Sequence, residues 1–131
     1  MQLSEMHFSD EASRKLSQLK GRTGLTPNIL ARIGFCLSVE NPGLPDPSDY
    51  EGTGYINIKR HVLTGVYDSL FVGLIKERCH QDSVPDVEIA THFKAHMNRG
   101  VLLLHKKLKS LDSLLLVLPP EMRNGESASD E

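Results

Sequence analysis

The chain has 131 residues, of which 24% are charged and 39% are hydrophobic, and its formal net charge is −2 at pH 7. These values are ordinary for one globular domain with a single core. The longest apolar runs have at most five residues, far short of the ~20 that span a bilayer, and the first residues do not resemble a secretion signal. We therefore expect a cytoplasmic protein without a membrane segment.

The first predicted element is a short strand at residues 5–8, where polar and apolar residues alternate. Ser9 follows as an N-cap, with two acidic residues in the first helical turn, where negative charge suits the helix dipole. Ala12, Leu16 and Leu19 have the spacing of a helix with one apolar face. The sequence therefore predicts a helix that ends near residue 20.

A tight turn and a second helix follow. Gly21 and Gly24 permit left-handed backbone angles at the end of the first helix. Thr26 and Pro27 then provide the N-cap and the first position of the second helix. Gly34 lies inside this helix, so we expect a neighbouring helix to approach its backbone closely. The expected buried face comprises Ile29, Leu30, Ile33, Cys36 and Leu37.

Three more helices are predicted after a loop at residues 41–54, which contains three prolines and three glycines. The third helix, at about residues 61–79, has apolar pairs every four residues, a stripe wide enough to face two partners. The fourth helix begins near residue 83, and we expect a kink or break at Asn98–Gly100. The fifth covers about residues 101–111 and can continue toward residue 118.

These elements predict a mainly α fold of about five helices with a short N-terminal strand. The first third has the strand, helix, turn and helix order of a ribbon-helix-helix module. We expect one helical domain at residues 1–118. Residues 119–131 are acidic and lack large apolar groups, so we expect a disordered tail there.

Charge is segregated along the chain. From Ala12 to Val39 there are five basic residues and no acidic one, whereas residues 40–58 hold four acidic residues and no basic one. A one-sign surface on a helical unit attracts a polyanion, most often nucleic acid. The helix start at Thr26 adds free N–H groups. The candidate phosphate contacts are therefore Arg14, Lys15, Lys20, Arg22, Thr26 and Arg32.

Other sequence patterns give weaker indications of a functional site. Lys106, Lys107 and Lys109 form a second basic cluster, which either extends the phosphate contacts or solubilises a leucine-rich helix. His92 and His96 share a helix face, but no dependable third ligand for a metal accompanies them. No nucleophile–base set, P-loop or dinucleotide motif is present. We therefore expect no catalysis, metal or cofactor.

The stretch Leu19–Ser38, LKGRTGLTPNILARIGFCLS, resembles the DndE family, the small component of bacterial DNA phosphorothioation. Two further segments, Tyr67–Arg78 and His92–Gly100, match what is expected of that family. Together the similar segments extend over most of residues 5–104. The acidic tail lies outside the resemblance.

The resemblance implies a protein encoded beside enzymes that replace a non-bridging phosphate oxygen of DNA with sulfur. The sulfur chemistry then belongs to cysteine desulfurase and iron–sulfur partners, and other sulfur modification proteins such as DndC and DndD are expected partners. It also implies a homotetramer that binds duplex DNA, notably nicked duplex, because a break lets the duplex bend at lower cost.

Three functions stay open at this stage. The first is a non-enzymatic, oligomeric DNA-binding subunit of the modification complex, in which Gly21 and Gly24 let another subunit's backbone come close. The second is an assembly scaffold that docks partner proteins. The third is a ribbon-helix-helix repressor with Glu5 and His7 pointing outward, although the negative charge of glutamate weakens attraction to the DNA backbone.

Overall fold

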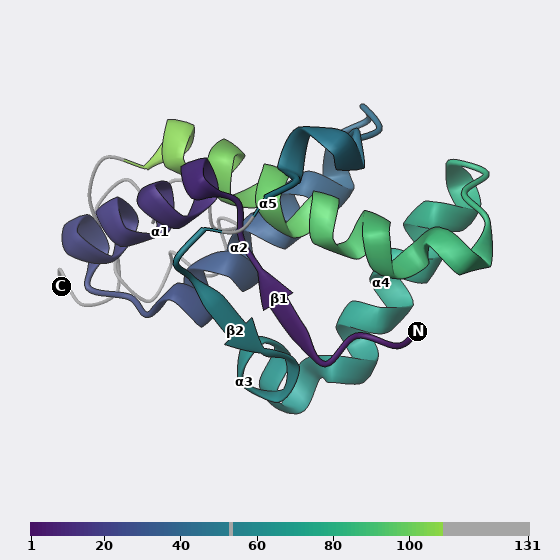
Figure 1. Cartoon of the computed structure of the whole chain (residues 1–131), viewed down its shortest axis with the longest axis horizontal. Coiled ribbons are helices and arrows are strands. Elements are labelled where there is room, and N and C mark those ends of the chain that lie inside the picture. The colour runs from purple at the N-terminus through teal and green to yellow at the C-terminus, as the bar shows by residue number, and fades with distance from the viewer. Residues whose placement is uncertain (53, 109–131) are drawn as a thin grey trace, which may run out of the picture.

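The computed structural model describes residues 1–52 and 54–108. Its helices and strands are β1 (Glu5–His7), α1 (Asp10–Thr23), α2 (Pro27–Glu40), β2 (Asn57–Lys59), α3 (Arg60–Thr64), α4 (Asp68–Gln81) and α5 (Ile89–Lys107). The predicted mainly α fold with a short N-terminal strand is thus confirmed. Figure 1 shows α5 running along the molecule, with α1 near its C-terminal end and α4 near its start.

Local sequence signals set both ends of α1. The Ser9 hydroxyl accepts a hydrogen bond from the backbone N–H of Ala12 at 3.1 Å, as predicted for an N-cap. At the other end Gly24 has φ +76°, and its N–H bonds to the carbonyl of Lys20. That left-handed conformation is what a glycine C-cap supplies. Leu16 and Leu19 of the predicted apolar face are fully buried.

The centre of the fold is the crossing of α2 and α5. At Gly34 an added Cβ would lie 2.6 Å from the backbone carbonyl of Gly100, so the two helix backbones are in direct contact. The close approach expected at Gly34 is therefore confirmed. Beside this contact Phe35 packs on Phe93 and Phe71, with ring centroids 5.2 and 5.4 Å apart respectively.

The predicted buried face of α2 is partly wrong: Leu30 is buried and Ile33 and Leu37 pack against the core, but the other two predicted residues are exposed. Cys36 is exposed and Ile29 is 38% exposed, whereas the buried positions are Leu30, Ala31, Gly34, Phe35 and Ser38. The helix is apolar around most of its circumference, so its period alone does not select a face. The contact of Gly34 with α5 rotates the helix by about one residue from the expected orientation.

Two helix boundaries also differ from the prediction. Gly65 adopts φ +57° and ψ −137°, which divides the expected third helix into α3 and α4. Conversely, α5 continues without a break through Gly100, because that glycine is needed for the contact with α2. Asn98 is fully buried in α5, where its side-chain oxygen accepts from the N–H of Ser9 at 2.8 Å.

The strand β1 pairs antiparallel with β2 of the same chain, with Met6 opposite Ile58. Met6 is buried, and the flanking Glu5 and His7 are partly exposed, as alternation predicts. Glu5 also forms an ion pair with Lys59 at 2.8 Å. The order of elements matches a ribbon-helix-helix module, but here the strand partner is intramolecular.

The expected helical continuation to residue 118, the domain boundary there, Lys109 and the acidic tail at 119–131 lie outside the described residues. Among the residues that the structure describes, no helix is both long enough and apolar enough to cross a membrane.

The helix crossing makes a prediction about two helical glycines. Gly34→Ala places a methyl group against the backbone of Gly100, so we expect a loss of roughly 1–3 kcal/mol in the free energy of unfolding. Gly73→Ala on α4 has open space around the added methyl group and gains about 0.5–1 kcal/mol from helix propensity. Urea unfolding of both variants measures the contrast, and equal stabilities would show that the α2–α5 contact is loose.

Candidate nucleic-acid interface

The last turn of α5 lies against α1. Arg22 Nη1 donates a hydrogen bond to the carbonyl of Leu108 at 3.3 Å, and Nε2 of His105 is hydrogen-bonded to Oε1 of Gln18 at 2.7 Å. Gln18 and Arg22 are one turn apart on α1, and Lys15 lies on the same side of that helix. The two contacts therefore bring the end of α5 beside the basic side of α1. Figure 1 shows the two helices next to each other there.

We call this region the α1–α5 basic surface and define it by Arg14, Lys15, Arg22, His105 and Lys106. Burial lowers the pKa of His105, and the charges of Lys15 and Arg22 lower it further. His105 of α5 therefore lies within the electrostatic influence of Lys15 and Arg22 of α1. Neither α5 nor the part of α1 after Glu11 contains an acidic residue. Glu11 lies one turn before Arg14 and Lys15 on the same side of α1 and neutralises part of the charge there, so the surface is most positive toward Arg22 and the end of α5.

Lys20 does not join this surface within one chain. Five residues separate it from Lys15, which on an α-helix corresponds to a rotation of roughly 140°. Its side of α1 faces the segment that follows the loop, where the Tyr55 hydroxyl is 2.6 Å from the hydroxyl of Ser17. Of the cations predicted on α1, the structure brings Arg14, Lys15 and Arg22 to one side and Lys20 to another.

Arg32 and Thr26 also lie apart from the basic surface. Arg32 Nε donates to the carbonyl of Leu63 at 2.6 Å, and its Nη2 donates to the carbonyl of Val62 at 3.1 Å. This guanidinium therefore binds the carbonyls at the end of α3, where positive charge is favourable. Thr26 is exposed at the start of α2 and makes no side-chain capping bond.

Two arginines that were not predicted as functional residues bind the C-terminal end of α2 and the loop after it. Arg78 donates to the carbonyls of Val39 at 2.7 Å and Gly43 at 2.9 Å, and it pairs with Asp82 at 2.8 Å. Arg99 donates to the carbonyl of Ser38 at 2.8 Å. The Arg78–Asp82 spacing of four residues on a helix was the only signal of this network in the sequence.

The two histidines of α5 lie inside this network. Nδ1 of His96 is 2.8 Å from the Ser38 hydroxyl, which also accepts from Arg99 Nε. Burial first, and then the charges of Arg99 and Arg78, lower the pKa of His96 to about 4. The remaining ring nitrogen of His96 and Nδ1 of His92 are buried and have no hydrogen-bond partner within the part of the chain that the structure describes.

His92 and His96 together provide a poor metal site. The described residues contain no group of three or more side chains that could hold a metal ion, and zinc sites use at least three protein ligands. The neighbouring arginines also oppose a divalent cation. The Ser38–His96 pair is equally unsuited to catalysis, since both residues are buried and a base with so low a pKa is weak.

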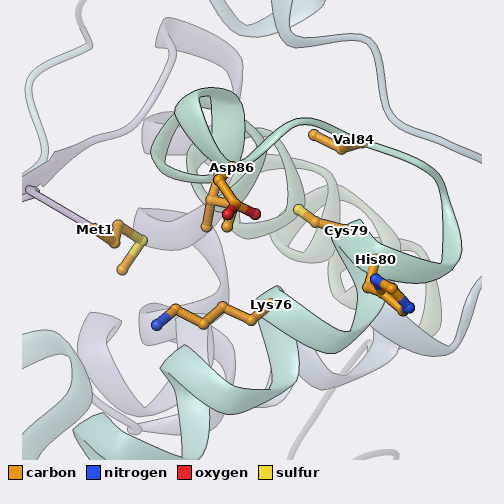
Figure 2. A pocket seen from close by; sticks show the side chains of 7 residues that line it. Met1, Lys76, Cys79, His80, Val84 and Asp86 are labelled. Atoms are coloured by element: carbon orange, nitrogen blue, oxygen red, sulfur yellow. The ribbon is translucent and has the colours of Figure 1, made fainter.

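A cavity of about 390 Å³ lies between the N-terminus, α4 and the start of α5 (Figure 2). Lys76, Cys79, His80 and Asp86 supply its reactive side chains. Burial raises the pKa of the Cys79 thiol, and the charge of Asp82 raises it further. The thiol is therefore protonated near neutral pH and is a poor nucleophile.

Comparison with known proteins identifies the family. A family model described as DNA sulphur modification protein DndE matches residues 5–112. The chain belongs to the DndE family. The match extends over both α1 and α5, so the whole basic surface lies in the family region, and the predicted resemblance is confirmed.

Two solved structures are similar in fold. DndE from Escherichia coli B7A, described as involved in DNA phosphorothioation modification, is 27% identical with a TM-score of 0.64, and the match covers 79% of this chain and 99% of that chain. A DndE G21/24K mutant described as involved in DNA phosphorothioation is 24% identical with a TM-score of 0.63 and the same coverage, and it supports the fold alone. No curated protein sequence gives a significant match.

The low pKa of His96 predicts how stability depends on pH. The folded protein binds fewer protons at this site than the unfolded chain between pH 6.5 and about 4, so the contribution of His96 is present above pH 6.5 and is lost as the pH falls. We expect wild type to lose roughly 1–2 kcal/mol more than His96→Gln over this window, after allowance for solvent screening.

Urea titrations at several pH values measure this difference. His80→Gln is the matched control because His80 is exposed on α4. Parallel pH profiles for wild type and His96→Gln would contradict the assignment of a neutral, buried imidazole.

Proposed function

We propose that this chain is a non-catalytic DNA-binding subunit of the phosphorothioation machinery and that the α1–α5 basic surface is its contact with duplex DNA. The supporting observation is that two helices distant in sequence meet through Arg22–Leu108 and His105–Gln18, and that the parts which meet contain cations and no acidic side chain. A positive surface without internal ion pairs is suited to neutralise phosphates.

The dimensions fit a strand of DNA. The 14 residues of α1 extend for about 21 Å, which corresponds to roughly six phosphates along one strand of B-DNA. Contacts from lysine and arginine to phosphates fix position and carry no base sequence. We therefore propose binding without strong sequence preference, and stronger binding to nicked duplex, which bends at lower cost.

Gly21 supports a proposal of self-association. It lies in the last turn of α1 and is exposed, and a Cβ added there would meet nothing within 4 Å. No contact with residues 1–52 or 54–108 requires a glycine at this position, although glycine costs a helix about 1 kcal/mol relative to alanine. We infer that the backbone of a second copy approaches here. A homotetramer built in this way can bring several basic surfaces, and Lys20, onto one duplex.

An assembly scaffold is the second candidate. Val66 is 91% exposed and Leu70 is 58% exposed, and both lie on the outward half of the apolar stripe predicted for residues 61–79. An exposed apolar face suits contact with a protein, and DndC and DndD are the partners we propose for it. This role is compatible with DNA binding on the α1 side. The intramolecular pairing of β1 gives no support to a ribbon-helix-helix repressor.

The DNA-binding proposal predicts a change in salt dependence. Lys15→Gln/Lys106→Gln should weaken duplex binding and make the slope of log K against log salt shallower by roughly 1.8, since each lost phosphate contact contributes about 0.9. Lys76→Gln/Lys94→Gln, which removes the same charge from α4 and the first half of α5, is the control. Gel shifts with intact, nicked and single-stranded DNA measure this, and equal slopes for the two variants would refute the assigned surface.

The association proposal predicts the effect of Gly21→Lys. This change introduces a bulky cation where the chain itself leaves open space, so the monomer should fold with an unchanged or higher melting temperature while the oligomer dissociates. Light scattering measures the mass, and Gly73→Lys on the exposed side of α4 is the control. An unchanged mass for Gly21→Lys would show that copies do not meet at this position.

A further inference from the structure

The described part of the chain ends at the basic surface. Leu108 is its last residue, and the carbonyl of Leu108 accepts a hydrogen bond from Arg22. The sequence that follows, residues 109–131, contains five acidic and two basic residues, a net charge of −3. Four of the acidic residues are concentrated in the last part: Glu121, Glu126, Asp130 and Glu131.

We propose, on the basis of the DNA-binding function proposed above, that the acidic segment 119–131 competes with DNA for the α1–α5 basic surface of its own chain. Glu121 is thirteen positions after Leu108, and a chain of thirteen steps spans at most about 45 Å. The whole of α1, about 21 Å long, is therefore within reach of these carboxylates.

Charge complementarity identifies this surface as their destination. Ala12–Val39 and α5 contain no acidic residue, and Arg14, Lys15, Arg22 and Lys106 take part in none of the ion pairs among the described residues. The loop at 41–54 is acidic by contrast and repels it. Glu11 weakens the attraction at the start of α1, so the carboxylates are expected nearer to Arg22 and the end of α5. Tethering to Leu108 gives the carboxylates an effective concentration in the millimolar range, although each exposed ion pair contributes at most about 1 kcal/mol.

The segment is a property of this chain and is not covered by the family model, which ends at residue 112. Weak, tethered carboxylates cannot prevent binding of a long polyanion, but they raise the affinity that DNA must have to displace them. Competition of this kind reduces non-specific binding most at low ionic strength, and it fades as salt screens both partners.

The test uses the full chain with the segment neutralised by Glu121→Gln, Glu126→Gln, Asp130→Asn and Glu131→Gln. A control with the same change in charge carries Glu40→Gln, Glu77→Gln, Asp86→Asn and Glu88→Gln, all exposed residues on other elements. Duplex affinity is measured by fluorescence anisotropy from about 50 mM to about 0.5 M salt, and the pKa of His105 is measured by NMR without DNA.

We expect the segment variant to bind duplex roughly three- to tenfold more tightly than the control at low salt, with the difference vanishing at high salt. We also expect its His105 pKa to fall, because nearby carboxylates favour the protonated imidazole. Equal affinities in the two variants overturn the competition, and an unchanged His105 pKa overturns the assigned location.

The experiment gives a different result if the proposed DNA-binding function itself is wrong. If none of the proteins binds duplex DNA, the proposed DNA-binding role and the competition both fail. The His105 pKa then tests the intramolecular contact separately: a fall confined to the segment variant supports it, and identical values in all three proteins overturn it.

Discussion

The backbone contact between Gly34 and Gly100 is the constraint on which the arrangement of this protein depends. Because neither residue has a side chain, α2 and α5 approach until their main chains touch, and every other element is positioned relative to this pair. Phe35 then fixes the neighbouring core through Phe71 and Phe93. The direction that α5 takes from this crossing brings its last turn to α1 and thereby assembles the basic surface.

The network of Arg78 and Arg99 secures the other end of the same crossing. The two guanidinium groups bind carbonyls at the C-terminal end of α2 and of Gly43 in the following loop, where the helix dipole favours positive charge. These two arginines therefore stabilise the fold by binding backbone carbonyls, and Arg32 does the same at the end of α3. Cations available to a polyanion are consequently concentrated near α1 and the end of α5.

The uneven distribution of charged residues explains how a protein with a net charge of −2 has one positive surface. Its acidic residues lie mainly in the loop at 41–54, around α4 and beyond residue 108, whereas α5 contains none. The exposed apolar residues Val66 and Leu70 occupy a different element from the cations. The proposed function accordingly assigns nucleic acid to one region of this DndE family member and a protein partner to another.

Much of this was determined by the sequence itself. Capping by Ser9, the glycine turn after α1, the helical character of most of the chain and the basic stretch at 12–39 depend on neighbours in the chain, and local rules are sufficient for them. Family membership was likewise recognisable from the stretch at 19–38. The close approach at Gly34 could be anticipated because a glycine inside a helix needs a packing reason.

Only the tertiary structure decided which faces meet. The buried face of α2 was misjudged because an all-round apolar helix has no preferred side until Gly34 meets Gly100, 66 positions away. The same long-range contact kept α5 continuous and brought its last turn to α1, where His105 meets Gln18. Contacts between residues so distant in sequence leave no local pattern, since each is fixed by the packing of whole helices.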